Sequence, residues 1–363
     1  MGDAPDEGTA GFRRGLVVGR FYPPHAGHAV SVGAAADACA RVAVVVRAAP
    51  TDTIPLRLRV DWLREEHRDL RHVEVVGVPD PSGPGGPRRR EELVGTVHAA
   101  LTALAVAHGR SPAESGIDAV FSSERHGEDL ARRLGAEHVY VGRRRAGVRV
   151  SGSDVRRDVA AHWHHLGAAV RAWLTRRVVV VGAESSGRTT LAAALAEHYR
   201  SRGGVWAWTR WVPAYDREIR KLAAPAVEAA RHGSPILVCD ADPLATALWE
   251  ERCLGTVSAE LDQAARARPP ALYLLTDHVG VVFEPGAGRR GGPPARWDGD
   301  DARRVARRRA AMTDRFRAVL AQSAVPVVEV TGSPRARLST AVDACDALLA
   351  AGWRLPPPPG RRS

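Results

Sequence analysis

The sequence predicts an α/β protein made of two doubly wound parallel-sheet domains, and three features indicate this. Short apolar runs alternate with segments of helical spacing in both halves, which is typical of parallel β-α-β units. A His-x-Gly-His stretch follows a first apolar run at residues 16–19, and a glycine-rich loop follows a second at residues 177–181. Both stretches lie where a strand gives way to a helix, the sheet edge at which nucleotides bind.

Length and composition narrow the class of protein. The 363 residues fit two domains, and a hydrophobic content of 45% is enough for two cores. Apolar runs such as residues 178–181 are far too short to cross a bilayer, and residues 1–11 carry no apolar segment of a secretory signal. We therefore expect a cytoplasmic protein that does not bind membranes. Its four cysteines lie in separate apolar segments, which predicts buried, reduced thiols: Cys39, Cys239, Cys253 and Cys345.

The net charge of +11 comes almost wholly from arginine, because Lys221 is the only lysine. These arginines are spread along the chain, with short runs such as residues 88–90 and 307–309. Arginine forks favour phosphate and carboxylate, so we assign the excess to phosphate substrates and solvated faces. We expect no specific DNA partner, since no helix-turn-helix precedes the first strand and the charge is dispersed.

The element pattern predicts the domain boundaries. Residues 1–12 are expected to be a disordered leader, and residues 353–363, which are rich in proline, a disordered tail. Residues 13–175 form the first predicted domain, including a linking helix, and residues 176–352 form the second. The strands expected within them cover residues 16–19, 42–46, 73–78, 119–121, 138–141, 177–181, 236–242, 271–275 and 327–330.

The first candidate site is the stretch from Arg20 to His28. Two imidazoles three residues apart can each donate an N–H to phosphate oxygens, and Gly27 between them lets the backbone approach closely. The helix that begins behind them adds a partial positive charge. The alternative is a turn that contains two histidines by chance.

A second segment, at residues 150–156, can complete that site. Ser151 and Ser153 can cap a helix and donate hydroxyls to a phosphate, and Arg156 can reach the same anion one turn later. Taken alone, this segment would favour an ordinary capped helix.

The second half begins with a phosphate-loop pattern in its strand–loop–helix context. The pattern is Gly-x-x-x-x-Gly-Lys-[Ser/Thr], except that Arg188 replaces the lysine. Backbone N–H groups of such a loop cradle a β-phosphate, and Thr189 would hold Mg²⁺. The candidate phosphate-binding residues are Gly182, Ser185, Ser186, Gly187, Arg188, Thr189 and Thr190.

Acidic residues follow two later strands of this half. Asp240 and Asp242 lie at the end of the strand expected at residues 236–242 and suit a Mg²⁺-organising acid and a base for a substrate hydroxyl. The alternative is a pair of turn aspartates before Pro243. Asp277 ends the next strand, and the glycine-, proline- and arginine-rich residues 282–297 are expected to form a mobile lid.

The first half resembles the nucleotidyltransferase superfamily with the His-x-Gly-His signature. In that family such groups grip the triphosphate of ATP while a phosphate nucleophile attacks the α-phosphorus, and no protein nucleophile takes part. The resemblance implies catalytic roles for His25, His28 and Arg156. It implies ATP contacts from Arg20, Phe21, Gly27, Ser151 and Ser153.

Over residues 15–349 the order of motifs resembles the NadR-like family, in which a nicotinamide mononucleotide adenylyltransferase is fused to a ribosylnicotinamide kinase. The resemblance implies the fold order nucleotidyltransferase, then P-loop kinase, with ATP, Mg²⁺, nicotinamide mononucleotide, ribosylnicotinamide and NAD as cofactor and ligands. Some members carry an N-terminal DNA-binding domain, which we expect this chain to lack. The motifs lie at residues 20–28, 62–65, 122–124, 134–136, 151–156, 162–163, 182–189, 211–218, 240–242, 274–278, 331–333 and Arg337.

The resemblance also implies a set of substrate-binding residues. Thr189 and Asp240 are expected to bind the metal, and Asp240 is also the expected catalytic residue of the kinase half. Three tryptophans are candidates to stack on a nicotinamide ring, but a core or interface position is favoured for each: Trp62, Trp163 and Trp211. The implied substrate-binding residues are Trp62, Tyr215, Arg217, Asp242 and Asp277.

The chain departs from the family pattern mainly in the kinase half. Arg188 replaces the loop lysine, Ala214 stands where a glutamate is expected, and the lid motif at residues 284–289 has no aspartate unless Asp298 replaces it. Gly142 stands in place of an aspartate in the first half. Guanidinium is a poor substitute for a point charge inside a phosphate nest. We therefore expect impaired kinase activity with nucleotide binding retained.

Two other functions remain open from the sequence. The second domain could be a non-catalytic nucleotide sensor that regulates the first. The first domain could instead act on another phosphate, such as phosphopantetheine, although a kinase-like partner disfavours this because only the pyridine-nucleotide reactions are consecutive. Homo-oligomerisation is also open.

Overall fold

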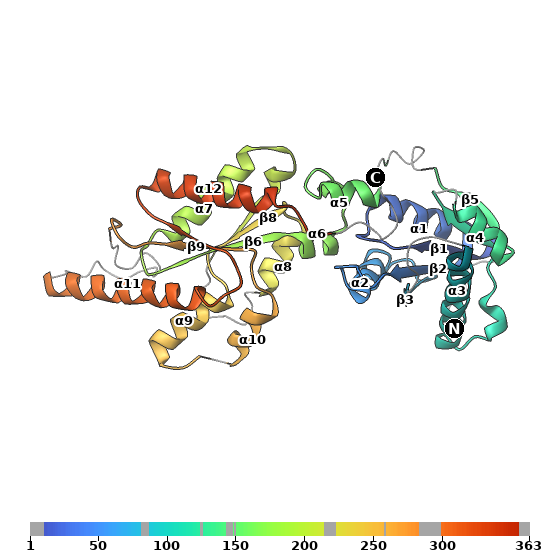
Figure 1. Ribbon diagram of the computed structural model, residues 1–363, viewed down its shortest axis with the longest axis horizontal. Helices are drawn as coiled ribbons and strands as arrows, with labels where there is room; N and C mark the ends of the chain where they lie inside the picture. The colour runs from blue at the N-terminus through green and yellow to red at the C-terminus, as the bar shows by residue number, and fades with distance from the viewer. Residues whose placement is uncertain are drawn as a thin grey trace. The chain divides into compact units, whose positions relative to one another are not determined.

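The computed structural model describes residues 11–80, 87–123, 126–142, 148, 150–213, 223–257, 259–282 and 299–355. The chain divides into two compact units: the first comprises the chain up to Val170 together with the C-terminal segment from Trp353, and the second spans Arg171–Gly352. The division falls within helix α6 (Ala168–Leu174), close to the boundary predicted after residue 175. Each unit carries one parallel five-stranded sheet, so the predicted α/β fold class is confirmed (Figure 1).

The first unit has the strand order β3-β2-β1-β4-β5, and all pairings are parallel. The chain runs outward from the central strand β1 to β3 and then returns to β4 on the other side. This makes the carboxyl end of β1 the topological switch point, where ligands of such sheets bind. The strands are β1 (Phe12–Gly19), β2 (Cys39–Ala48), β3 (Val73–Pro79), β4 (Ala119–Ser122) and β5 (Glu137–Tyr140).

Helices cover both faces of this sheet, because β-branched residues on both sides of β1 and β2 leave two apolar faces to bury. One face carries α1 (Ala26–Ala38) and α2 (Leu56–Glu66), whose small or apolar side chains pack on β1 and β2. The other face carries α3 (Pro87–Ala107) and α4 (His126–Leu134). A short helix, α5 (Gly152–Arg157), follows β5.

The second unit also contains one parallel sheet. Its strand order is β10-β9-β6-β8-β7, and all its pairings are parallel. Its central strand is β6, whose valines are buried on both faces. The carboxyl end of β6 is therefore the switch point of this sheet. The strands are β6 (Arg176–Gly182), β7 (Arg210–Val212), β8 (Ile236–Cys239), β9 (Leu272–Thr276) and β10 (Val327–Val330).

Helices α7 (Arg188–Ser201) and α12 (Pro334–Ala350) cover one face of this second sheet. Helices α9 (Pro243–Leu254) and α11 (Gly299–Leu320) cover the other face, as Figure 1 shows. Within the described residues, no helix is long and apolar enough to cross a membrane. The remaining helices are α8 (Ala223–Arg231) and α10 (Ala259–Ala267).

The two chain ends differ from the predicted leader and tail. Strand β1 already begins at Phe12, which was assigned to a leader, because its ring packs edge-on against Phe121 at 6.2 Å. In the predicted tail, the Leu355 side chain is buried, and the Thr53 hydroxyl donates to the Arg354 carbonyl at 2.9 Å. Residues 1–10 and 356–363 lie outside the described residues.

The prediction of four buried thiols is wrong for one of them. Cys39, Cys239 and Cys345 are buried in the cores, whereas Cys253 is exposed near the end of α9. Burial raises the pKa of Cys39 to about 11 and that of Cys345 to about 12. The prediction failed for Cys253 because an apolar sequence segment was taken to be buried as a whole. In the helix, Cys253 and its neighbour Leu254 are both exposed.

We predict that native protein reacts rapidly with a thiol reagent at a single cysteine, Cys253. Only the thiolate is nucleophilic, and the buried thiols are both shielded and held protonated at neutral pH. A DTNB titration should show one fast thiol in the native protein and four after denaturation. The fast phase should vanish in Cys253→Ser and persist in Cys345→Ala; several fast thiols in the native protein would contradict the described cores.

Candidate functional site

The two histidines of the first site are fixed by the backbone at the start of α1. His25 is the N-cap residue, and its Nδ1 accepts the Gly27 N–H at 3.1 Å. The Nδ1 of His28 accepts the His25 N–H at 3.2 Å. A ring nitrogen that accepts a hydrogen bond carries no proton, so each neutral imidazole bears its proton on Nε2. The fold thereby presets both rings, 3.8 Å apart between centroids, as Nε2–H donors.

Gly27 is required where the two segments of this site meet. A β-carbon added there would lie 3.0 Å from the Cε1 atom of His25 and 3.2 Å from the carbonyl oxygen of Val150. Both neighbours belong to the site, so any larger residue would displace the imidazole or the loop before α5. The close approach of the Gly27 backbone to a phosphate stays a prediction.

Ser151 and Arg156 take the places that the sequence predicted around α5. Ser151 caps the helix and also bonds the Asp154 carboxylate, with its hydroxyl 2.6 Å from Oδ2. Arg156 donates through Nη2 to the Ser153 hydroxyl at 3.1 Å and through Nη1 to the Tyr22 carbonyl at 2.8 Å. The bond to Tyr22 joins α5 to the histidine turn across more than a hundred residues of sequence.

These contacts make one site from two distant segments. A β-carbon added at Gly152 would lie 3.0 Å from Arg156 Nη1 and 3.7 Å from His25 Nε2. His25, Arg156 and the glycines Gly27 and Gly152 therefore converge at the carboxyl end of β1. The result is a concentration of N–H donors beside a helix N-terminus, which suits the binding of phosphate groups.

Arg20 lies at the same turn, and its guanidinium pairs with the Asp52 carboxylate. The other oxygen of Asp52 is 3.1 Å from Nη2 of Arg59, a fully buried arginine on α2. Arg59 donates through Nη1 to the Arg20 carbonyl at 2.7 Å. Burial lowers the pKa of Arg59, and the Asp52 charge opposes that shift.

The Asp52–Arg59 pair was missed from the sequence. Arg59 occupies the apolar face of its helix, at the spacing shared by Leu56 and Leu63. A charged residue within such a stripe is the signal that could have revealed it, because a buried guanidinium requires partners.

Phe21 and the tryptophans are not positioned as ligand contacts. Phe21 has a positive φ of 48°, but its side chain is buried in the first core, 4.7 Å from the His28 ring. Any contact of Phe21 with phosphate would have to come from its backbone. Trp62 and Trp163 are buried, and Trp211 packs against the core of the second unit. The core interpretation of these tryptophans fits the structure.

The phosphate-loop pattern forms a tight turn between β6 and α7. Gly182 and Gly187 have φ values of 153° and 83°, and a β-carbon at Gly182 would lie 2.2 Å from the Thr276 hydroxyl oxygen. The buried Ser186 hydroxyl is 2.6 Å from that same hydroxyl. The Ser186 side chain therefore ties the loop to β9 and is directed away from a phosphate in the loop.

Thr189, Arg188 and Asp240 meet at the start of α7. The Thr189 hydroxyl donates to Oδ2 of the buried Asp240 at 2.5 Å. Nε of Arg188 lies 3.7 Å from the other carboxylate oxygen, so the arginine that replaces the usual lysine is paired with Asp240. A hydroxyl and a carboxylate side by side are oxygen ligands of the kind that Mg²⁺ prefers. Thr190, next on the first turn of α7, is exposed.

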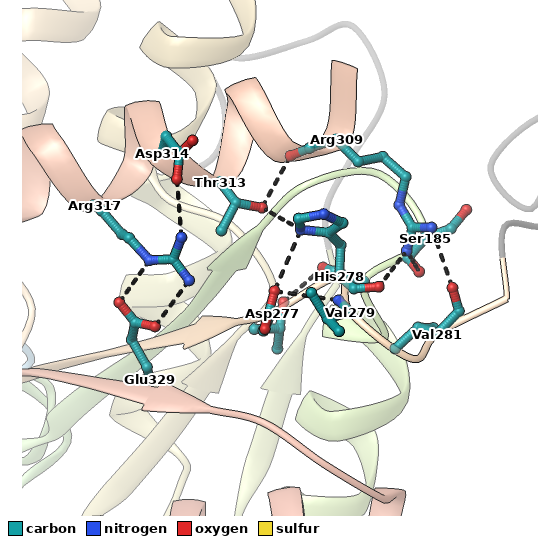
Figure 2. Close-up of polar contacts among 12 residues, drawn as sticks. Ser185, Asp277, His278, Val279, Val281, Arg309, Thr313, Asp314, Arg317 and Glu329 are labelled. Carbon is teal, nitrogen blue, oxygen red and sulfur yellow. Dashed lines mark hydrogen bonds and ion pairs between the residues drawn. The ribbon is translucent and has the colours of Figure 1, made fainter. Parts of the chain in front are cut away.

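Asp242 and Asp277 have different surroundings. Asp242 caps α9 by accepting the Ala245 N–H at 2.8 Å and accepts the Tyr273 hydroxyl at 2.6 Å. Burial raises its pKa, and those hydrogen bonds oppose the shift. This is the capping role of a turn aspartate, not a position for contact with substrate. Asp277 ends β9, where it accepts the Val279 N–H and lies 3.3 Å from His278 Nδ1 (Figure 2).

Several predicted features fall outside the described residues. They comprise two substrate-binding candidates, the glutamate-replacing alanine and nearly all of the expected lid: Tyr215, Arg217, Ala214 and residues 283–298.

Comparisons with known proteins agree with this arrangement. A family model described as an AAA domain matches residues 177–337, the part of the chain that contains the phosphate loop. The trifunctional NAD biosynthesis/regulator protein NadR of Escherichia coli (strain K12) is 24% identical over 213 residues, and that of Salmonella typhimurium is 23% identical over 213 residues. Each alignment covers 54% of this chain and 48% of the relative, so the chain matches about half the length of these curated relatives.

Two solved structures share the fold over nearly the whole chain. A NadR protein in complex with NR has a TM-score of 0.66 at 17% identity, and a NadR protein in complex with NAD and AMP-PNP has a TM-score of 0.62 at 18% identity. In both, the match covers 98% of this chain and 99% of the other. In its two parallel sheets and its phosphate loop, the chain is therefore similar to these NadR proteins.

Proposed function

We propose that the first unit transfers AMP from ATP to nicotinamide mononucleotide, which gives NAD and pyrophosphate. The observation that carries this proposal is the convergence of His25, Arg156 and Gly27 at the carboxyl end of β1. The names of the relatives, which refer to NAD biosynthesis, and the NAD and AMP-PNP bound to a NadR protein of the same fold support the choice of substrates.

In this reaction a phosphate oxygen of nicotinamide mononucleotide attacks the α-phosphorus of ATP, and pyrophosphate leaves. The enzyme supplies no nucleophile, so its contribution is to position the two phosphates and to stabilise the charge that develops on them. The Nε2–H groups of His25 and His28 and the guanidinium of Arg156 are donors suited to that task. Their orientations are set before substrate arrives, because Gly27 N–H, His25 N–H and the Tyr22 carbonyl hold the three side chains.

Arg20 adds charge to the same end of the strand. Asp52 orients its guanidinium, and Arg59 offsets the negative charge of Asp52 from the other side. The cluster of Arg20, Asp52 and Arg59 therefore carries one net positive charge, which favours a triphosphate.

We propose that the second unit binds Mg·ATP and phosphorylates ribosylnicotinamide slowly. Thr189 and Asp240 would hold Mg²⁺, which would neutralise part of the phosphate charge when bound. The pairing of Arg188 with Asp240 supports a reduced rate, because a guanidinium engaged by a carboxylate gives less charge to the γ-phosphate. The NR complex of a NadR protein of the same fold supports the substrate class.

The same pairing favours a second candidate function for this unit. If Arg188 stays with Asp240 when ATP binds, the unit would hold nucleotide without turning it over and would act as a sensor. Measuring phosphorylation of ribosylnicotinamide and binding of Mg·ATP on the same preparation distinguishes the two functions.

For the first unit, we predict that His28→Ala lowers the turnover of NAD synthesis by about 10²-fold or more, the effect of removing one preorganised donor to developing charge. The measurement is NAD formed from ATP and nicotinamide mononucleotide, together with the melting temperature. The matched control is His98→Ala, at an exposed histidine of α3, which should leave turnover unchanged. Near-normal turnover by folded His28→Ala would refute the assignment.

For the second unit, we predict that Asp240→Ala abolishes phosphorylation of ribosylnicotinamide. Arg188→Lys alone should change the rate by less than about fivefold, because the departures at Ala214 and in the lid act on the same step and such losses are not additive. The measurement is ribosylnicotinamide-dependent ADP release with Mg²⁺, and the control is Arg200→Lys on the same helix, where the arginine pairs with Glu197. Rapid phosphorylation by Arg188→Lys would show instead that Arg188 alone limits the wild type.

A further inference from the structure

The outer turn of the phosphate loop contains a residue in an unfavourable conformation. Ser185 has a φ of 51°, in the left-handed region that favours glycine. Non-glycine residues in this region carry strain and persist only where their surroundings hold them there. Since the loop depends on this turn to aim its N–H groups, something must hold Ser185 in place.

Arg309, on α11, is positioned to do this. Its Nη2 donates to the Ser185 carbonyl at 2.9 Å and to the His278 carbonyl at 3.2 Å, and its Nη1 donates to the Val281 carbonyl at 3.1 Å. Figure 2 shows the guanidinium between Ser185 on the loop and the segment that follows β9. The Arg309 side chain is buried, so these bonds are shielded from water.

The helix holds Arg309 through a second contact chain. The Thr313 hydroxyl donates to the Arg309 carbonyl at 3.0 Å and lies 3.0 Å from His278 Nδ1, which in turn lies 3.3 Å from Asp277. Figure 2 shows Thr313 and His278 side by side between α11 and the end of β9. Thr313 therefore links the backbone of Arg309 to His278, whose carbonyl accepts the Arg309 guanidinium. This link limits how far the guanidinium can move.

The peptide that Arg309 contacts lies within the turn of the phosphate loop. The Ser185 carbonyl belongs to the same peptide group as the Ser186 N–H, which makes a 3.3 Å bond to the Ala183 carbonyl within the turn. The next carbonyl, that of Ser186, accepts Nη1 of Arg337 at 2.7 Å. Two guanidiniums from different helices thus hold consecutive peptide groups by their carbonyl ends. This holds the turn in place, orients the Gly187 N–H that shares a peptide group with the Ser186 carbonyl, and places positive charge behind the loop.

We propose that Arg309 is a positioning residue for phosphate binding by the second unit: it holds Ser185 in its left-handed turn and so keeps the loop shaped for the phosphates of a nucleoside di- or triphosphate. The inference rests on the proposed nucleotide binding of this unit. Arg309 acts through the backbone of the loop, and no contact between its guanidinium and a phosphate is required.

The test is titration of the full chain with Mg·ADP and Mg·ATP, which should reveal one binding isotherm from each unit. The second unit's isotherm is the one removed by Gly182→Ala, where the added β-carbon would lie 2.2 Å from Thr276 Oγ1. Arg309→Met should weaken that isotherm by about tenfold to a hundredfold, the loss expected for charge-assisted hydrogen bonds. The first unit's isotherm should not change and serves as an internal control.

Two further variants separate positioning from general stability. Arg309→Lys keeps the charge but lacks the fork, so its affinity should fall between those of the wild type and Arg309→Met. Arg317→Met lies on the same helix, where Arg317 pairs with Glu329 and not with the loop, and should bind as the wild type does (Figure 2). Affinity for adenosine, which has no phosphate, should be the same in all these variants.

Wild-type affinity for ADP in folded Arg309→Met would overturn the inference, as would an equal loss of adenosine and ADP affinity. If Arg309→Met does not fold, Arg309→Lys decides: wild-type affinity refutes the inference, and a phosphate-specific loss supports it. A wild-type chain with a single isotherm that Gly182→Ala leaves in place would overturn the proposed nucleotide binding itself, and the inference with it.

Discussion

Guanidinium groups that donate to main-chain carbonyls hold the turns of both candidate sites. Arg156 bonds the carbonyl of Tyr22, and Arg59 bonds that of Arg20, in the first unit. Arg309 and Arg337 bond carbonyls of the phosphate loop in the second. A turn that aims its N–H groups at a ligand directs its carbonyls into the protein, where they need donors of their own. Arginine meets that need across a gap between elements, because its five donors form a rigid fork.

This use of arginine changes the interpretation of the chain's charge. Phosphate ligands and solvated faces were expected to account for the arginine excess, and exposed pairs such as Arg317 with Glu329 agree with the second of these. Arg59, Arg309 and Arg337, however, are buried and bonded to backbone. Composition cannot distinguish such residues from surface arginines, because the distinction lies in which distant carbonyl each one reaches.

Local sequence predicted the fold class and the turns, because strand–turn–helix junctions are encoded by neighbouring residues. The valine-rich strands β2 and β6, the N-cap serine of α5 and the glycines of the phosphate loop follow from spacing alone. The residues that support those turns were missed, since Asp52 and Arg309 act on elements far from them in sequence. Ser186 and Asp242 were assigned to ligand contacts because their motifs place them near a site, yet the structure directs both side chains into the protein.

The two sites differ in the groups that surround the aspartate paired with an arginine. Asp52 faces two guanidiniums, those of Arg20 and Arg59, so its cluster keeps a net positive charge. Asp240 pairs with the guanidinium of Arg188 and accepts the neutral hydroxyl of Thr189, so the cation of this site is bound to its metal-ligand candidate.

The first arrangement can attract a triphosphate without rearrangement. In the second, Arg188 can turn to a phosphate only by leaving a buried carboxylate, which is unfavourable unless another cation takes its place. A divalent ion held by Asp240 and Thr189 would be such a cation. The charge of the second site would then depend on Mg²⁺ arriving with the nucleotide, whereas the first carries its positive charge in its own side chains. On this argument, Arg188 and the metal compete for the same carboxylate, which is the physical reason to expect phosphoryl transfer to be the slower of the two proposed reactions.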